Sequence, residues 1–64
     1  MYSEIIGYVV VENAGYEDER DVQERKDYWE ALDWAVANYD PDEMEKLHIA
    51  IASVDAEGNR SYEN

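Results

Sequence analysis

The chain has 64 residues with 17 acidic and five basic side chains, and its net charge of −12 excludes direct binding to nucleic acid or an anionic membrane. It has no cysteine for a disulfide framework, and residues 1–12 lack the basic segment and apolar length of a signal peptide or membrane span. Its 45% hydrophobic content, with two Trp and six Tyr, is too high for a disordered acidic tail, so we expect one cytoplasmic domain over residues 1–64.

Residues 4–12 are predicted to form the first strand, because they are rich in β-branched and aromatic side chains. Apolar residues occupy both faces of this run, which is typical of a central strand. Gly7 indicates a bulge or a close approach by a helix. Asn13, Ala14 and Gly15 predict a turn, and residues 16–20 form a polar connection with room for a brief second strand.

A long helix is predicted over residues 22–39, which contain neither Gly nor Pro. Asp21 and Glu24 have the D-x-x-E spacing of a capping box, with Asp21 as the N-cap. At helical spacing, one apolar face would hold the helix on the sheet, and it consists of Tyr28, Leu32, Ala35, Val36 and Tyr39.

The C-terminal third of the chain predicts a short helical turn and two further strands. Asp40 precedes Pro41 and therefore ends the long helix, and Asp40, Pro41 and Glu43 then predict a second capped start, with a turn that runs to Lys46. Residues 47–54 alternate larger and smaller apolar side chains as a strand does. Residues 55–59 form a hairpin loop, with Gly58 available for a left-handed position, and residues 60–63 form a short closing strand.

The expected fold is α+β, a small β-α-β-β domain. A three-stranded sheet carries the long helix on one face, and the short helical turn joins the helix to the second strand. A right-handed crossover would make the two long strands parallel, whereas the helical turn lengthens the return path and also permits an antiparallel pair.

No pattern in the chain predicts catalysis, a cofactor or a metal site. His48 is the only histidine and has no orienting carboxylate or second ligand at a recognised spacing, so we interpret it as an ordinary half-exposed strand residue. The serines stand in no nucleophile-elbow context. The acidic runs at residues 40–45 and 55–59 lack the ligand positions of a calcium loop. We therefore expect a protein that is not an enzyme.

Acidic residues recur at every third position from residue 18 to residue 33: Asp18, Asp21, Glu24, Asp27, Glu30 and Asp33. On one helix this ladder would wind across the outer face. The ordinary alternative is a solvated surface in which neighbouring cations pair partly with the acids. Against it, the acids from Glu30 to Glu45 have only Lys46 near them, and uncompensated repulsion destabilises a small domain. We therefore expect the charge to serve binding.

Trp34 is predicted to share the outer helix face with Asp33, where a tryptophan is a preferred interface anchor. The alternative for this side chain is packing over its helix neighbours, since Trp is usually largely buried. The acids resume after the long helix. The predicted partner-binding residues are Glu24, Asp27, Glu30, Asp33, Trp34, Asp40, Asp42, Glu43 and Glu45.

In its size, charge, lack of cysteine and acidic ladder, the chain resembles the small acidic inhibitors encoded by phages and mobile elements, including anti-CRISPR and anti-restriction proteins. The resemblance implies a DNA mimic that blocks the nucleic-acid-binding site of a host effector. The implied partner is a basic nucleic-acid-binding protein or complex in the bacterial cytoplasm, and the preferred candidate is a CRISPR effector.

A second function from another class is a non-enzymatic regulatory or antitoxin-like interaction module. Such a module could pair with a second copy through its short third strand, because an edge strand offers unpaired backbone groups. The chain would then be a weak homodimer instead of a monomer.

Overall fold

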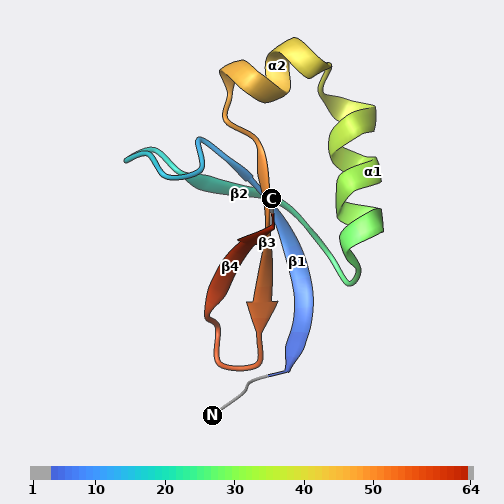
Figure 1. The fold of residues 1–64 in the computed structure, drawn as a ribbon, viewed down its shortest axis with the longest axis vertical. Helices are drawn as coiled ribbons and strands as arrows, with labels where there is room; N and C mark the ends of the chain where they lie inside the picture. The colour runs from blue at the N-terminus through green and yellow to red at the C-terminus, as the bar shows by residue number, and fades with distance from the viewer. Residues whose placement is uncertain (1–3, 64) are drawn as a thin grey trace.

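The computed structural model describes residues 4–63, and these form one antiparallel sheet with two helices (Figure 1). The sheet has the strand order β2-β1-β3-β4. The predicted α+β class is confirmed, but the prediction of three strands is wrong, because the described residues form four. The elements are β1 (Ile5–Glu12), β2 (Arg20–Arg25), α1 (Tyr28–Asn38), α2 (Pro41–Lys46), β3 (Ala50–Asp55) and β4 (Arg60–Glu63).

Strand β1 is central, as its apolar faces predicted. It pairs antiparallel with both β2 and β3, so the two long strands β1 and β3 are not parallel. Its residues Val9, Val10 and Val11 are fully buried. The bulge predicted at Gly7 is present as a register shift between Ile5 and Gly7. The close neighbour there is β2, because a Cβ on Gly7 would lie 3.2 Å from the Arg25 carbonyl oxygen.

Strand β2 occupies the segment where the long helix was predicted to begin, so the predicted helix boundaries are wrong. Helix α1 starts at Tyr28, and its N-cap is Asp27, whose Oδ1 accepts from the backbone N–H groups of Trp29 at 2.7 Å and Glu30 at 3.4 Å. Residues 20–25 pair with β1 instead. The pairing supplies the backbone hydrogen bonds of this polar segment, and this tertiary gain outweighs the helix propensity of its Arg, Gln and Glu residues.

Helix α1 packs on the sheet through Ala31 and Ala35, which are fully buried against Val10 of β1 and Ile51 of β3. We call these four residues the helix-side cluster. The alanines are small enough for the helix backbone to approach the sheet closely. This seating rotates α1 by about 60° from the predicted face, at about 100° per residue. Val36, predicted to face inward, is consequently 62% exposed.

Helix α2 has the predicted capping box. The Asp40 carboxylate accepts from the Glu43 N–H at 2.8 Å, the Glu43 carboxylate accepts from the Asp40 N–H at 3.2 Å, and Pro41 occupies the first turn. Leu47 caps the other end of α2, and His48 follows with a φ of 50°. The chain needs this turn to reverse from helix to strand. β3 therefore starts at Ala50, and His48 is an exposed turn residue and not the predicted strand residue.

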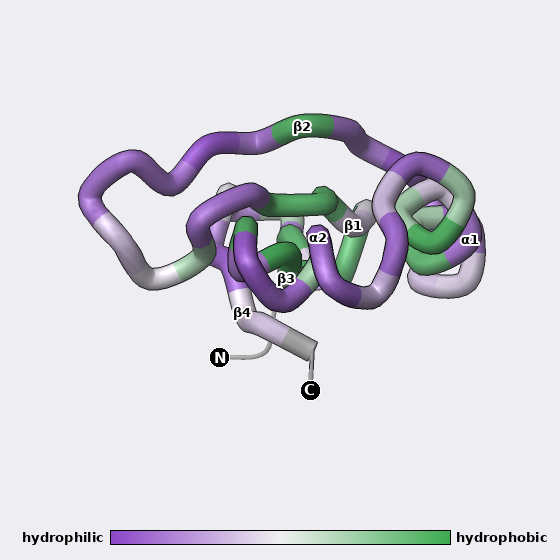
Figure 2. The backbone as a smooth tube through the Cα atoms, turned by 90° about the horizontal axis from the view of Figure 1, so that it is seen from above, coloured by the Kyte–Doolittle hydropathy of each residue, from purple (hydrophilic) through white to green (hydrophobic). Residues whose placement is uncertain are grey.

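The closing hairpin agrees with its prediction. Gly58 has a φ of 85°, and the Asp55 carboxylate accepts from the backbone N–H groups of Glu57 and Asn59, each at 2.9 Å. These contacts fix the turn between β3 and β4. In Figure 2 the hydrophobic colour concentrates in β1 and β3, whereas most of β2 and the loop before it are hydrophilic.

The assignment of the α1 N-cap is testable by substitution. Asp27→Ala should lower the free energy of unfolding by about 1 kcal/mol, because two backbone N–H groups lose their acceptor. Asp33→Ala is the matched control, since this exposed acid lies inside the same helix and should change stability by less than about 0.5 kcal/mol. Urea denaturation followed by circular dichroism measures both. Equal, negligible losses in the two variants would contradict the assignment.

Candidate functional site

The two helices and their caps, residues 27–47, form a strongly acidic layer that we call the helical layer. It holds seven Asp and Glu against one basic residue, Lys46, so its net charge of −6 is half of the total of −12. Figure 1 shows α1 and α2 following one another around one side and one end of the sheet. The acids of this layer are Asp27, Glu30, Asp33, Asp40, Asp42, Glu43 and Glu45.

Three acids of the helical layer also hold the fold. Asp27, Asp40 and Glu43 accept hydrogen bonds from backbone N–H groups at the starts of α1 and α2. Their negative charge is favourable there, because a helix N-terminus carries partial positive charge. Substitutions at these positions would alter folding and binding together. The remaining four acids are exposed and their carboxylates accept none of these cap hydrogen bonds, although Glu30 and Asp42 lie in the first turns of the helices, so they test binding more cleanly.

The acidic ladder is not one surface. Glu24 lies in β2 directly opposite Val9, so its side chain belongs to the sheet face away from α1. Asp21 lies on that same face opposite Val11, and Asp18 accepts a hydrogen bond from the Asn13 side chain in the preceding loop at 3.1 Å. The structure therefore brings the predicted acids from Asp27 onward into one layer and separates Glu24 from them.

Of the two positions considered for Trp34, the outward one is wrong, and the packed alternative is the one that the structure has. Because α1 is rotated, Trp34 is half-buried against the helix-side cluster, and its ring meets that of Tyr39 edge to face at 6.0 Å. The tryptophan that the helical layer exposes is Trp29, at 67%. The sequence held a signal for this arrangement. Asp27 and Glu30 also have D-x-x-E spacing, and a helix that starts there places Trp29 in the first turn.

The sheet face away from α1 buries a second cluster, Val9, Val11 and Ala52, which we call the sheet-side cluster. Strand pairing places Asp21 beside Val11 and Tyr62 beside Ala52 on this face. These neighbours come from β2 and β4, the two edges of the sheet. Side chains from the edge strands therefore border the sheet-side cluster, which is built from small residues.

Two contacts connect the edges across this face. The Arg60 guanidinium donates to both carboxylate oxygens of Asp21, at 2.6 and 2.5 Å, and the Tyr62 hydroxyl donates to Glu19 at 2.5 Å. Asp21 is in β2 and Arg60 in β4, so the first contact spans β1 and β3. We call these four residues the cross-sheet clamp. It contains one of the two ion pairs found within residues 4–63.

The clamp shifts the ionisation of its members. The hydrogen bond from Arg60 lowers the pKa of Asp21, and the hydrogen bond from Tyr62 lowers the pKa of Glu19. The Gly15 N–H, 2.7 Å from Glu19, lowers the Glu19 pKa further. In return, the bond to Glu19 raises the pKa of the Tyr62 hydroxyl. These shifts favour ionised Asp21, ionised Glu19 and protonated Tyr62 near neutral pH, which are the forms that make the two clamp contacts.

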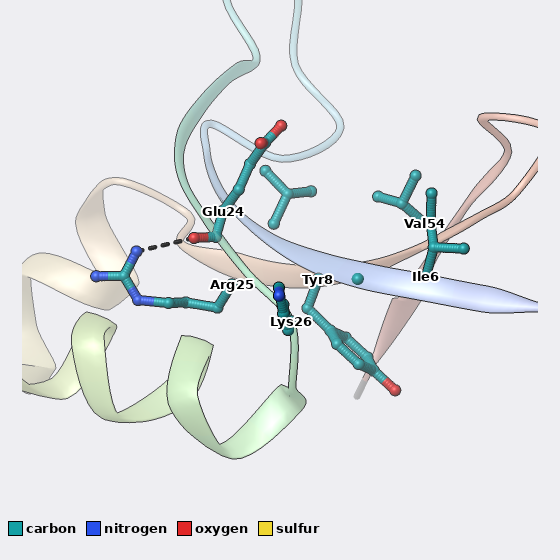
Figure 3. A pocket seen from close by; sticks show the side chains of 8 residues that line it. Ile6, Tyr8, Glu24, Arg25, Lys26 and Val54 are labelled. Carbon is teal, nitrogen blue, oxygen red and sulfur yellow. Dashed lines mark hydrogen bonds between the residues drawn. The ribbon is translucent and has the colours of Figure 1, made fainter.

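An open hollow of about 270 Å³ lies beside Gly7, where β1 bulges. Ile6 and Val54 provide apolar wall, and Lys26 lies at the same hollow (Figure 3). Arg25 turns away toward the helices, and its Nη1 donates to the Glu24 carbonyl oxygen at 2.8 Å. The residues around the hollow form no nucleophile–base pair, so we assign it no chemistry.

Within residues 4–63, no three His, Asp or Glu side chains converge as metal ligands. His48, the residue with the chemistry most often used in catalysis, stacks on Tyr16 with ring centroids 4.5 Å apart. Both rings lie in exposed turns. This pair is a surface contact between two loops, and it supplies no arrangement for proton transfer.

Comparisons of the chain with protein-family models, characterised proteins and solved structures gave no match. In the part of the chain that the structure describes, no helix is long and apolar enough to span a membrane.

The clamp predicts a specific loss of stability in acid. The lowered pKa of Asp21 adds stability above its unfolded-state pKa, and this stability is lost as pH falls through the folded-state pKa. In Arg60→Met, the free energy of unfolding should therefore decrease less steeply with falling pH below about pH 4. Near neutral pH, this variant should be less stable than the native chain by less than about 1 kcal/mol.

The measurement is urea denaturation at a series of pH values. Lys46→Met is the matched control, because it removes one positive charge from α2 and leaves the clamp intact. It should keep the acid dependence of the native chain. If the acid dependence of Arg60→Met equals that of the native chain, the contact between Arg60 and Asp21 makes no contribution to stability.

Proposed function

We propose that the chain is a non-enzymatic inhibitor that occupies the nucleic-acid-binding groove of a basic host effector, with a CRISPR effector as the preferred target. The observation that supports this most strongly is the charge of the helical layer, seven acids against Lys46. A groove that binds nucleic acid is lined by Lys and Arg for the phosphates. The carboxylates of the helical layer would meet the same cations.

The distribution of the cations supports this proposal. Arg20 pairs with Glu12 at 3.2 Å and Arg60 with Asp21, so both arginines neutralise acids of the sheet. Helix α1 contains no basic residue. The helical layer therefore carries half of the net charge on about a third of the residues, and such a dense negative surface steers a positively charged partner toward it and speeds association.

The caps support it as well. Asp27 fixes the start of α1, and the Asp40–Glu43 box fixes the start of α2. The carboxylates of Glu30, Asp33, Asp42 and Glu45 are consequently carried by helices with defined ends. A surface that is already ordered loses less conformational entropy on binding than a flexible acidic tail does.

The alternative, a regulatory or antitoxin-like module, is favoured by one feature. Among the strands of residues 4–63, β4 pairs with β3 alone, so its other edge could take a further strand. A second copy of the chain could pair there. However, each copy carries a net charge of −12, and the repulsion between two such copies opposes this dimer. We therefore prefer the inhibitor.

The proposal predicts that charge reversal on α1 abolishes inhibition. Expression of the native chain in a bacterium with an active CRISPR system should restore plaque formation by a targeted phage. With Glu30→Lys combined with Asp33→Lys, the number of plaques should be at least about tenfold lower, because both positions would carry a positive charge that repels the cations of the groove. Binding of the native chain to the effector should also weaken between about 50 and 200 mM salt.

The matched control is Glu4→Lys combined with Glu17→Lys. It makes the same change in net charge at exposed positions outside the helical layer, and it should keep full inhibition. Circular dichroism confirms folding of both variants. Equal inhibition by the two double variants would remove the helical layer from the mechanism. Binding that does not depend on salt would favour the regulatory module.

A further inference from the structure

Helix α1 exposes an apolar stripe on the side away from the sheet. Trp29 is 67% exposed and Val36 is 62% exposed. They stand seven positions apart, so they point within about 20° of each other around the helix. Asp33, four positions after Trp29 and three before Val36, lies on the same side between them. The stripe is therefore an apolar surface bordered by the Asp33 carboxylate.

Trp29 is held in place by its neighbours. Its ring meets Tyr28 edge to face at 5.3 Å, and Tyr28 meets Tyr8 of β1 in the same way at 5.9 Å. Its backbone N–H donates to the Asp27 carboxylate at 2.7 Å. This series of contacts runs from the sheet to the surface. The exposed indole is consequently oriented before any partner arrives, as an interface anchor requires.

The Asp33 carboxylate determines which chemistry fits this stripe. A purely apolar partner surface would bury Asp33 without a counter-charge, which is unfavourable. An arginine satisfies both features, because its planar guanidinium can stack on an indole and still donate to a carboxylate. A lysine fits less well, since its ammonium is a compact and strongly hydrated charge.

We propose that Trp29 and Val36, with Asp33 beside them, are the anchor that receives an arginine side chain of the protein partner. The guanidinium stacks on Trp29 and pairs with a carboxylate, and the methylene stem lies along Val36. This inference rests on the proposed function and names the group that the helical layer recognises in a basic groove.

Two cationic peptides of equal length test the anchor, namely nona-arginine and nona-lysine, with calorimetry at about 150 mM salt. Both should bind through charge, and nona-arginine should bind more tightly. Trp29→Ala should weaken the binding of nona-arginine about tenfold, or ~1.4 kcal/mol, and the binding of nona-lysine by less than about twofold. Trp29→Phe should keep part of the preference, because Phe also presents an aromatic face.

The matched control is Tyr16→Ala, which removes an exposed aromatic ring outside the helical layer. It should leave both affinities unchanged. If Trp29→Ala weakens the binding of both peptides equally, or changes the binding of neither peptide, the arginine anchor is refuted. The proposed function then still stands if Glu30→Lys with Asp33→Lys weakens both peptides. If this charge reversal also has no effect, the helical layer is not the docking surface, and the proposed function fails with the anchor.

Discussion

The contact between Arg60 and Asp21 joins the two edges of the sheet, and the arrangement of the rest of the molecule is consistent with it. Helix α1 covers one face, whereas the other face buries Val9, Val11 and Ala52, which side chains from the edge strands border. Asp21 can reach Arg60 only if residues 20–25 form a strand beside β1. The chain left for α1 then starts at Tyr28, which gives a short helix with Trp29 in its first turn.

The position of β2 divides the acidic residues into those that stabilise the fold and those that remain on the surface. Asp21 and Glu19 belong to the clamp, and Asp27, Asp40 and Glu43 cap helices. Two of the five basic residues, Arg20 and Arg60, pair with acids of the sheet. The helical layer therefore keeps almost all of its charge uncompensated. In a domain this small, such repulsion is tolerated more readily if the surface is compensated by a cationic partner.

Local signals predicted the elements whose stability is local. The apolar run of β1, the capping box of α2 and the β3–β4 hairpin needed no knowledge of the rest of the chain. The start of α1 could not be predicted locally, because the D-x-x-E spacing occurs at Asp21 and again at Asp27. Only the pairing of residues 20–25 with β1 decides which of these two aspartates is the N-cap. The seating of Ala31 and Ala35 on the sheet likewise exchanged the expected positions of Trp34 and Val36.

Hydrogen exchange tests the proposed docking surface most directly. The backbone amides of the chain are compared alone and in complex with the proposed target, a basic nucleic-acid-binding effector. The account predicts slower exchange in peptides covering residues 28–46, the segment of α1 and α2, with little change in β4. Protection confined to β4, or to the Gly7 hollow between β1 and β2, would contradict it and assign binding to the sheet.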